Sequence, residues 1–159
     1  MNDAVTDIRC MLIPLHEGRL LLPNAGVAEV IGYRDPERVM RTESWLRGEV
    51  HWHQREIPVV DFERLRGQPR RKGGVRQRIV VCYAADGELE RPLVGLIAQG
   101  IPRLLRVNPM VIEDASKPLD PESPVLMSLQ IDDEHLLVPD IDQVVKRCAA
   151  AFRKQDARA

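Results

Sequence analysis

The sequence predicts an all-β domain that ends in one α-helix. Most apolar segments of the chain are short and are separated by Gly, Pro or Asp, which is typical of strands joined by turns. Only the C-terminal segment carries apolar side chains at helical spacing. With 159 residues, the chain is long enough for one domain made of two subdomains that share a core.

The first part of the chain alternates apolar segments with turns. Strands are expected at residues 9–15, 19–23, 27–31, 49–53 and 56–61. The last two of these are expected to form a hairpin whose turn lies at Gln54-Arg55. Asp35-Pro36-Glu37 is expected to begin a short helical turn, because Pro suits the first position of a helix.

A basic segment follows at residues 64–78, with seven basic side chains and no acidic one. Because it also contains Gly67, Pro69, Gly73 and Gly74, we interpret it as an exposed loop between two halves of the chain. The segment would suit nucleic acid or an acidic partner, but it lacks the interleaved aromatic residues of single-strand binders.

A second set of strands is expected at residues 79–84, 92–98, 101–107, 126–131 and 136–139. Residues 108–124 hold four of the twelve prolines and are expected to form a long loop. Asp132-Asp133-Glu134 would suit a cation, but its position between two apolar segments favours a hairpin turn.

The C-terminal segment is predicted to be a helix. Asp140 is the expected N-cap, with Gln143 three residues further on as in a capping box. One apolar stripe is formed by Ile141, Val144, Val145, Cys148 and Phe152. We expect this stripe to pack on the strands, and the polar tail beyond Arg153 to fray.

Charge and cysteine content exclude several classes of protein. Lys plus Arg number 23 and Asp plus Glu number 24, so the chain lacks the overall positive charge that favours nonspecific nucleic-acid binding. Cys10, Cys82 and Cys148 are odd in number and far apart, which indicates a reducing compartment. No apolar segment has the length of a membrane span. We expect a cytoplasmic protein that does not insert into membranes and does not bind nucleic acid.

The most chemically suggestive side chains are His51 and His53. In a strand they would lie on one face, opposite Trp52, and could bind zinc if His16 or His135 supplied a third ligand. The alternative is a polar outer face with Trp52 turned into the core. The chain contains no phosphate-binding glycine loop, HExxH, GxSxG or paired CxxC motif. We therefore expect no catalytic activity, no cofactor and no metal, with a metal-dependent enzyme and an SH3- or OB-like nucleic-acid module as alternatives.

Several segments, taken in order, resemble one known family. Trp45-Leu46-Arg47-Gly48, followed by Ile57-Pro58-Val59-Val60-Asp61-Phe62, is similar to the CheW-like family of chemotaxis coupling proteins. Similar segments occur upstream at residues 27–33 and downstream at 93–101 and 135–142. The resemblance covers roughly residues 9–148, and we treat residues 1–159 as a single CheW-like domain.

The resemblance implies a fold and a function. The fold would be two intertwined five-stranded SH3-like β-barrels with a shared apolar core, a groove between them and a C-terminal helix. The function would be that of a non-catalytic adaptor that couples a CheA-type histidine kinase to methyl-accepting chemoreceptors.

The resemblance also implies a set of partner-binding residues. Val27 and Glu29 fall on the groove side that the family uses for receptors, where Glu29 would pair with a cation at the rim. Val94 and Gly95 fall in strands that line the groove or face the kinase. The family's Arg-Gly turn falls here on His53-Gln54, and Trp52 and His53 complete the expected set. Because the arginine is missing, the sequence looks more like the divergent members found in the chemosensory systems of type IV pilus twitching motility.

Overall fold

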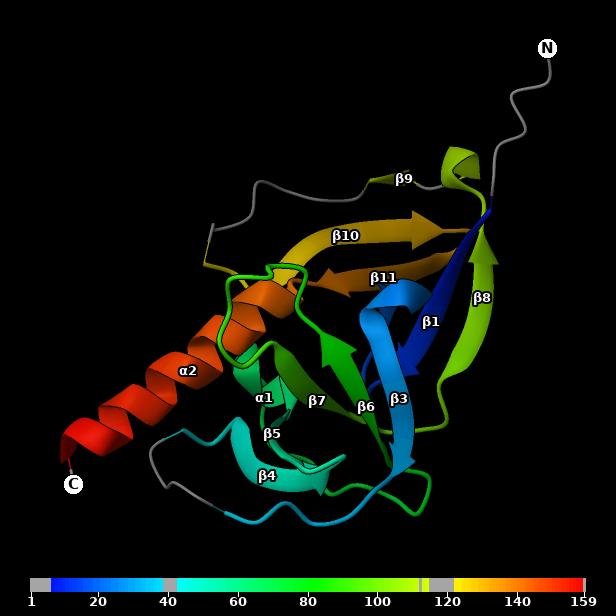
Figure 1. Ribbon diagram of the computed structural model, residues 1–159. Helices are drawn as coiled ribbons and strands as arrows, with labels where there is room; N and C mark the ends of the chain where they lie inside the picture. The colour runs from blue at the N-terminus through cyan, green and yellow to red at the C-terminus, as the bar shows by residue number, and fades with distance from the viewer. Residues whose placement is uncertain (1–6, 39–42, 112, 115–121, 159) are drawn as a thin grey trace.

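The computed structural model describes residues 7–38, 43–111, 113–114 and 122–158, and consists of two β-sheets and a long C-terminal helix (Figure 1). The terminal sheet, built from the two ends of the chain, has the strand order β8-β1-β2-β11-β10-β9. Its strands are β1 (Ile8–Pro14), β2 (Arg19–Pro23), β8 (Arg103–Val107), β9 (Glu113–Asp114), β10 (Val125–Ile131) and β11 (Glu134–Pro139). Because β9 has only two residues, this sheet is in essence five-stranded.

The central sheet is built from the middle of the chain in the order β3-β6-β7-β5-β4. Its strands are β3 (Val27–Gly32), β4 (Leu46–Trp52), β5 (Arg55–Val60), β6 (Arg78–Tyr83) and β7 (Leu93–Ala98). The chain enters this sheet through the 3₁₀ turn η1 (Asn24–Gly26) and leaves it after β7, and a second such turn, η2 (Pro109–Val111), follows β8. The two sheets are therefore intertwined, as expected.

The position of the basic segment differs from the prediction. Residues 64–78 connect β5 to β6, and both of these strands belong to the central sheet. The segment therefore does not divide the chain into two halves. Its first residues belong to a short helix that we did not predict, α1 (Phe62–Leu65), whose N-cap Asp61 accepts a hydrogen bond from the Arg64 amide.

A shared apolar core lies between the two sheets and the C-terminal helix α2 (Ile141–Arg158). Strand β6 shows how the buried side chains are divided. Val80 and Cys82 face the shared core, while Ile79 and Val81 face a second apolar cluster enclosed by the central sheet. In the terminal sheet, β1 divides its side chains in the same way between the shared core and a third cluster. Strands buried on both faces explain why the apolar runs in the sequence are nearly continuous.

The central sheet closes into a barrel across its two edge strands, β3 and β4. Trp52 at the end of β4 donates a hydrogen bond from Nε1 to Glu29 Oε2 of β3 over 2.7 Å. After β3, the chain runs along the free edge of β4, where Glu37 and Glu49 exchange two backbone hydrogen bonds of 2.8 and 2.9 Å. The predicted helical turn at Asp35-Pro36-Glu37 is therefore wrong, because the edge of β4 takes up the Glu37 amide and carbonyl in an extended pairing.

Two further predictions concern turns. The β4–β5 hairpin turns at His53-Gln54, one residue before the predicted Gln54-Arg55. The turn between β10 and β11 at Asp132-Asp133 is confirmed. Of residues 108–124, the stretch 115–121, which includes two of the prolines, lies outside the described residues.

Helix α2 begins as predicted. The Asp140 side chain accepts a hydrogen bond from the Gln143 amide at 3.1 Å, which confirms the N-cap. Ile141, Val144, Val145 and Cys148 are buried in the shared core, and Phe152 packs against it. The helix continues to Arg158, so the predicted fraying beyond Arg153 is not observed.

Gly48 offers a test of the barrel closure. It has φ +137°, and a Cβ there would lie 2.7 Å from the carbonyl carbon of Glu37. We expect Gly48→Ala to lower the free energy of unfolding by about 2–4 kcal/mol in urea denaturation, because the strand edge must move away. The matched control is Gly32→Ala, also in a strand but with open space around it, which we expect to change stability by less than about 0.5 kcal/mol. Equal effects of the two substitutions would contradict this account of the closure.

Candidate functional site

The main candidate site is an apolar groove of about 560 Å³ where the two sheets meet the start of α2. The terminal sheet contributes Leu22, Leu126 and Val138, and the central sheet contributes Tyr83, with Ala84 directly after it. Tyr83 is 48% exposed and Leu126 is 57% exposed, so both present side-chain surface to a partner. Such a groove suits the apolar face of a partner.

A β-bulge places Leu126 at the groove. In the pairing of β10 with β11, Val125 lies opposite Pro139 and Met127 opposite Val138, so Leu126 is the extra residue. A bulge re-aims the side chain that it inserts, and here it turns a leucine outward while Val125 remains buried.

Val27 and Glu29 were both expected on the groove side, and a second bulge separates them. Val27 pairs with Cys82, whereas Glu29 pairs with Val81, so one extra residue, Ala28, lies between them. Val27 packs against the shared core next to the groove, which Gly26 lines. Because Cys82 and Val81 face opposite sides of the sheet, Glu29 lies on the other face from Val27 and does not line this groove.

Glu29 instead forms a cluster with Trp52 and His53 at the rim of the central barrel. In addition to the Trp52 hydrogen bond, His53 Nε2 lies 3.3 Å from Glu29 Oε2, and the rings of Trp52 and His53 meet edge to face at 4.5 Å. Hydrogen bonding by Trp52, and secondarily by His53, lowers the pKa of Glu29 below its ordinary value. Three of the six residues expected to bind partners are thus brought together, with the carboxylate of Glu29 held by groups of its own chain.

Val94 and Gly95 lie where no partner can reach them. Val94 is 0% exposed in the shared core. Gly95 is buried in the middle of the central sheet, where a Cβ would lie 2.7 Å from Ile79 Cγ2. The expectation that these two residues contact partners is therefore corrected, because β7 is an interior strand with both faces covered.

The geometry also argues against the histidine metal site. His53 has φ 42° and belongs to the turn, so it does not share a strand face with His51, whose Nδ1 pairs with Glu56 at 2.8 Å. His16 Nδ1 pairs with buried Glu63 at 2.7 Å. In the described part of the chain, no group of three or more His, Cys, Asp or Glu side chains is placed to hold a metal ion.

Cys82 and Cys148 are buried core thiols. Burial raises the pKa of each to about 12, so neither is a reactive thiolate near neutral pH. Cys10 is also buried, and its pKa is raised for the same reason.

Sequence reasoning missed Tyr83 and Leu126, the two most exposed large side chains of the groove. Both occur at the ends of apolar segments and look like ordinary strand residues. Their exposure depends on the bulge in β10 and on the meeting of the two sheets, and neither can be read from one strand alone.

A double barrel that exposes an apolar groove has the architecture of a domain that binds other proteins. The family model described as "CheW-like domain" matches residues 9–149, and the chain belongs to this family. Its members are non-catalytic scaffold proteins of chemotaxis signalling, and this chain is a CheW-like scaffold.

A solved structure supports the fold. The scaffolding protein TtCheW from Thermoanaerobacter tengcongensis superposes with a TM-score of 0.69 at 18% sequence identity, over 84% of this chain and 88% of that chain. This likeness confirms the predicted architecture of two SH3-like barrels. No curated protein sequence matches the chain.

The Glu29 cluster predicts a pH dependence. Because the pKa of Glu29 is lower in the folded state than its ordinary value of 4.5, its contribution to stability is present above that value and is lost as the pH falls through the lower, folded-state pKa. In a Trp45→Phe background, Trp52 fluorescence should change in the same acid range. Glu29→Gln should abolish this transition, and a transition that persists in Glu29→Gln would contradict the assignment.

The β4–β5 turn predicts a stabilising substitution. His53 and Gln54 both have positive φ, 42° and 62°, the conformation of a type I′ turn, which favours Gly at its second position. We expect Gln54→Gly to raise the free energy of unfolding by about 1 kcal/mol in urea denaturation. Arg55→Gly, one residue on and inside β5, is the control and should lower it. A loss of stability in Gln54→Gly would show that the turn is not strained.

Proposed function

We propose that this chain is the adaptor that couples a CheA-type histidine kinase to methyl-accepting chemoreceptors, and that the groove receives the receptor's helical hairpin. The observation that carries the proposal is the apolar groove with Leu126 and Tyr83 exposed in it. An amphipathic helix binds such a groove by placing its apolar face against it, and the affinity comes from burial of those side chains.

The kinase would use a second surface. The rim cluster of Glu29, Trp52 and His53 lies on the central barrel and on the opposite face of β3 from Val27. An adaptor needs two surfaces at fixed relative geometry, and the shared core supplies that rigidity. Moderate affinity at each surface is sufficient when many copies lie in an array.

We place the chain in a chemosensory system of the type IV pilus kind, in the cytoplasm. The support for the pilus system is the β4–β5 turn. His53-Gln54 stands where the family has Arg-Gly, and histidine lacks the planar, forked guanidinium of arginine. This departure resembles the divergent family members of pilus systems. For the location, we note that no helix in the described ranges has the length and apolar character of a membrane span. Deletion of the gene should impair twitching and spare swimming, and the reverse result would contradict the pilus assignment.

The groove gives a direct test of receptor binding. Leu126→Glu introduces a carboxylate into the apolar groove and should weaken binding of a receptor-tip fragment at least about tenfold, because the charge must be desolvated on docking. Leu126 is largely exposed, so the thermal melt should not change. Isothermal titration calorimetry measures the binding.

The matched control is Leu104→Glu, at a 67% exposed leucine on β8 that does not line the groove. It should bind the receptor fragment like wild type. Equal binding by both variants would exclude the groove as the receptor site. If wild type binds neither the receptor tip nor the CheA-type kinase, the adaptor proposal fails.

A further inference from the structure

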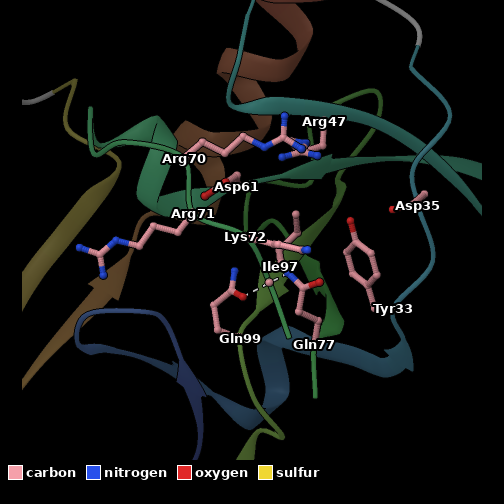
Figure 2. Close-up of a pocket in the computed structure, with 11 residues that line it drawn as sticks. Tyr33, Asp35, Arg47, Asp61, Arg70, Arg71, Lys72, Gln77, Ile97 and Gln99 are labelled. Atoms are coloured by element: carbon pink, nitrogen blue, oxygen red, sulfur yellow. Dashed lines mark hydrogen bonds between the residues drawn. The ribbon is translucent and has the colours of Figure 1, made fainter. Parts of the chain in front are cut away.

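A second pocket, of about 480 Å³, lies on the central barrel and is polar rather than apolar (Figure 2). Its walls come from β4, from the chain around the end of β7, and from the basic segment between α1 and β6. Tyr33, Gln77 and Gln99 line it, and Gln77 Nε2 donates a hydrogen bond to Gln99 Oε1 at 3.1 Å. The groove is lined by different residues, so the two sites are separate.

Three cationic side chains converge on this pocket without partners. The heads of Arg47, Arg70 and Lys72 line it, and none forms a hydrogen bond or ion pair with another residue that the structure describes. Other basic side chains of the same segment are engaged, since Arg64 donates to Ser44 and Arg78 donates to the Gln77 carbonyl. Three cations without a side-chain partner among the described residues thus line one pocket, in a chain whose formal net charge is −1.

The backbone aims these side chains. Arg47 is the extra residue of a β-bulge, because Leu46 pairs with Val60 and Gly48 with Val59. Arg71 also lines the pocket, but its guanidinium points away from Arg70 and Lys72 (Figure 2). It pairs with Glu17 at 2.6 Å. Its neighbours Arg70 and Lys72 project to the other side, as alternate residues of an extended segment do.

The segment that carries Arg70 and Lys72 is anchored to the rest of the protein. His16 Nε2 lies 3.3 Å from the Lys72 carbonyl oxygen, on the same side as the Arg71–Glu17 pair. Gly73 passes directly over the Gln77 side chain, where a Cβ would collide with the amide. The backbone that carries Arg70 and Lys72 is therefore held beside the pocket before any ligand arrives, which reduces the entropic cost of binding.

Two carboxylates also line the pocket and do not neutralise it. Asp61 is the N-cap of α1 and accepts a hydrogen bond from the Arg64 amide at 3.1 Å. Asp35 accepts a hydrogen bond from the Tyr33 hydroxyl, and burial, with Asp35 as a lesser cause, raises the pKa of that hydroxyl. Arg47, Arg70 and Lys72 therefore outnumber the two acids.

We propose that this pocket binds a phosphate monoester, held by Arg47, Arg70 and Lys72. Two guanidinium groups and an ammonium match the several oxygens and the double charge of such a group, because Arg binds phosphate in a bidentate manner. A free phosphorylated metabolite and a phosphorylated side chain share this chemistry. The proposal is independent of receptor and kinase binding.

The test uses the full-length protein, inorganic phosphate and ¹⁵N NMR at constant ionic strength. Phosphate should shift the amide signals of Gly73 and Gln77 in a saturable manner, and chloride or acetate at equal ionic strength should not. Arg70→Gln and Arg47→Gln should each weaken phosphate binding at least tenfold. Arg76→Gln is the matched control, since it removes the same charge from the same segment at a residue that does not line the pocket, and should change binding less than twofold.

Two further ligands distinguish the sources of phosphate. Tighter binding of a nucleoside monophosphate than of inorganic phosphate supports a metabolite, and tighter binding of a phosphoserine peptide supports a modified side chain. Absence of saturable shifts overturns the proposal. Equal weakening by Arg70→Gln and Arg76→Gln also overturns it, because the effect would then be one of overall charge. None of these results bears on binding at the groove.

Discussion

The fold depends on strands that are buried on both faces. β6 and β7 send alternate side chains into the interior of their own barrel and into the core shared with the other barrel and α2. Neither barrel can therefore move away from the other without exposing a large apolar surface to water. This accounts for a composition with only 4% aromatic residues, since aliphatic side chains pack well on both sides of a pleated sheet.

Burial of this kind leaves few regular strand positions for contact with other molecules. The exposed residues that we assign to binding surfaces occur where the regular pairing of strands is interrupted. One bulge turns Leu126 into the groove. Another turns Arg47 into the pocket that Arg47, Arg70 and Lys72 line, here called the basic pocket. A third bulge, at Ala28, brings Glu29 to the rim of the barrel. Bulges, turns and edges can vary without disturbing the core, so a scaffold of this type can change partners while the fold is retained.

Burial of strands on both faces also determines how much of the fold could be predicted from the sequence. Most strands were placed to within about two residues, because each is an uninterrupted apolar run bounded by turn residues. Their arrangement in sheets was not predictable from pattern, since a strand covered on both faces shows no alternation of polar and apolar residues. The Gly, Pro and basic residues of the segment 64–78 predict an exposed loop between two halves, whereas the segment joins two strands of one sheet. The resemblance of the segments around Trp45 and Ile57 supplied the fold and the family, but carried-over residues such as Val94 and Gly95 proved to be interior.

Register is the reason that individual site residues were harder to predict than the fold. A bulge shifts every later residue of a strand to the opposite face, and its position depends on the partner strand, which no local pattern reveals.

Besides the apolar core, hydrogen bonds between residues far apart in the sequence also link the two sheets. The carboxylate of Glu63 on α1, only 6% exposed, accepts hydrogen bonds from the His16 ring at 2.7 Å and from the Glu17 amide at 3.1 Å, in the turn between β1 and β2. That turn also holds the basic segment through Glu17 and His16. The loop over the basic pocket is therefore tied to the β1–β2 turn by exposed polar contacts, and that turn is tied to α1 by partly buried ones. The groove is fixed to both sheets by the apolar core. A molecule built in this way presents its binding surfaces in one constant arrangement, which is the physical property that a scaffold requires.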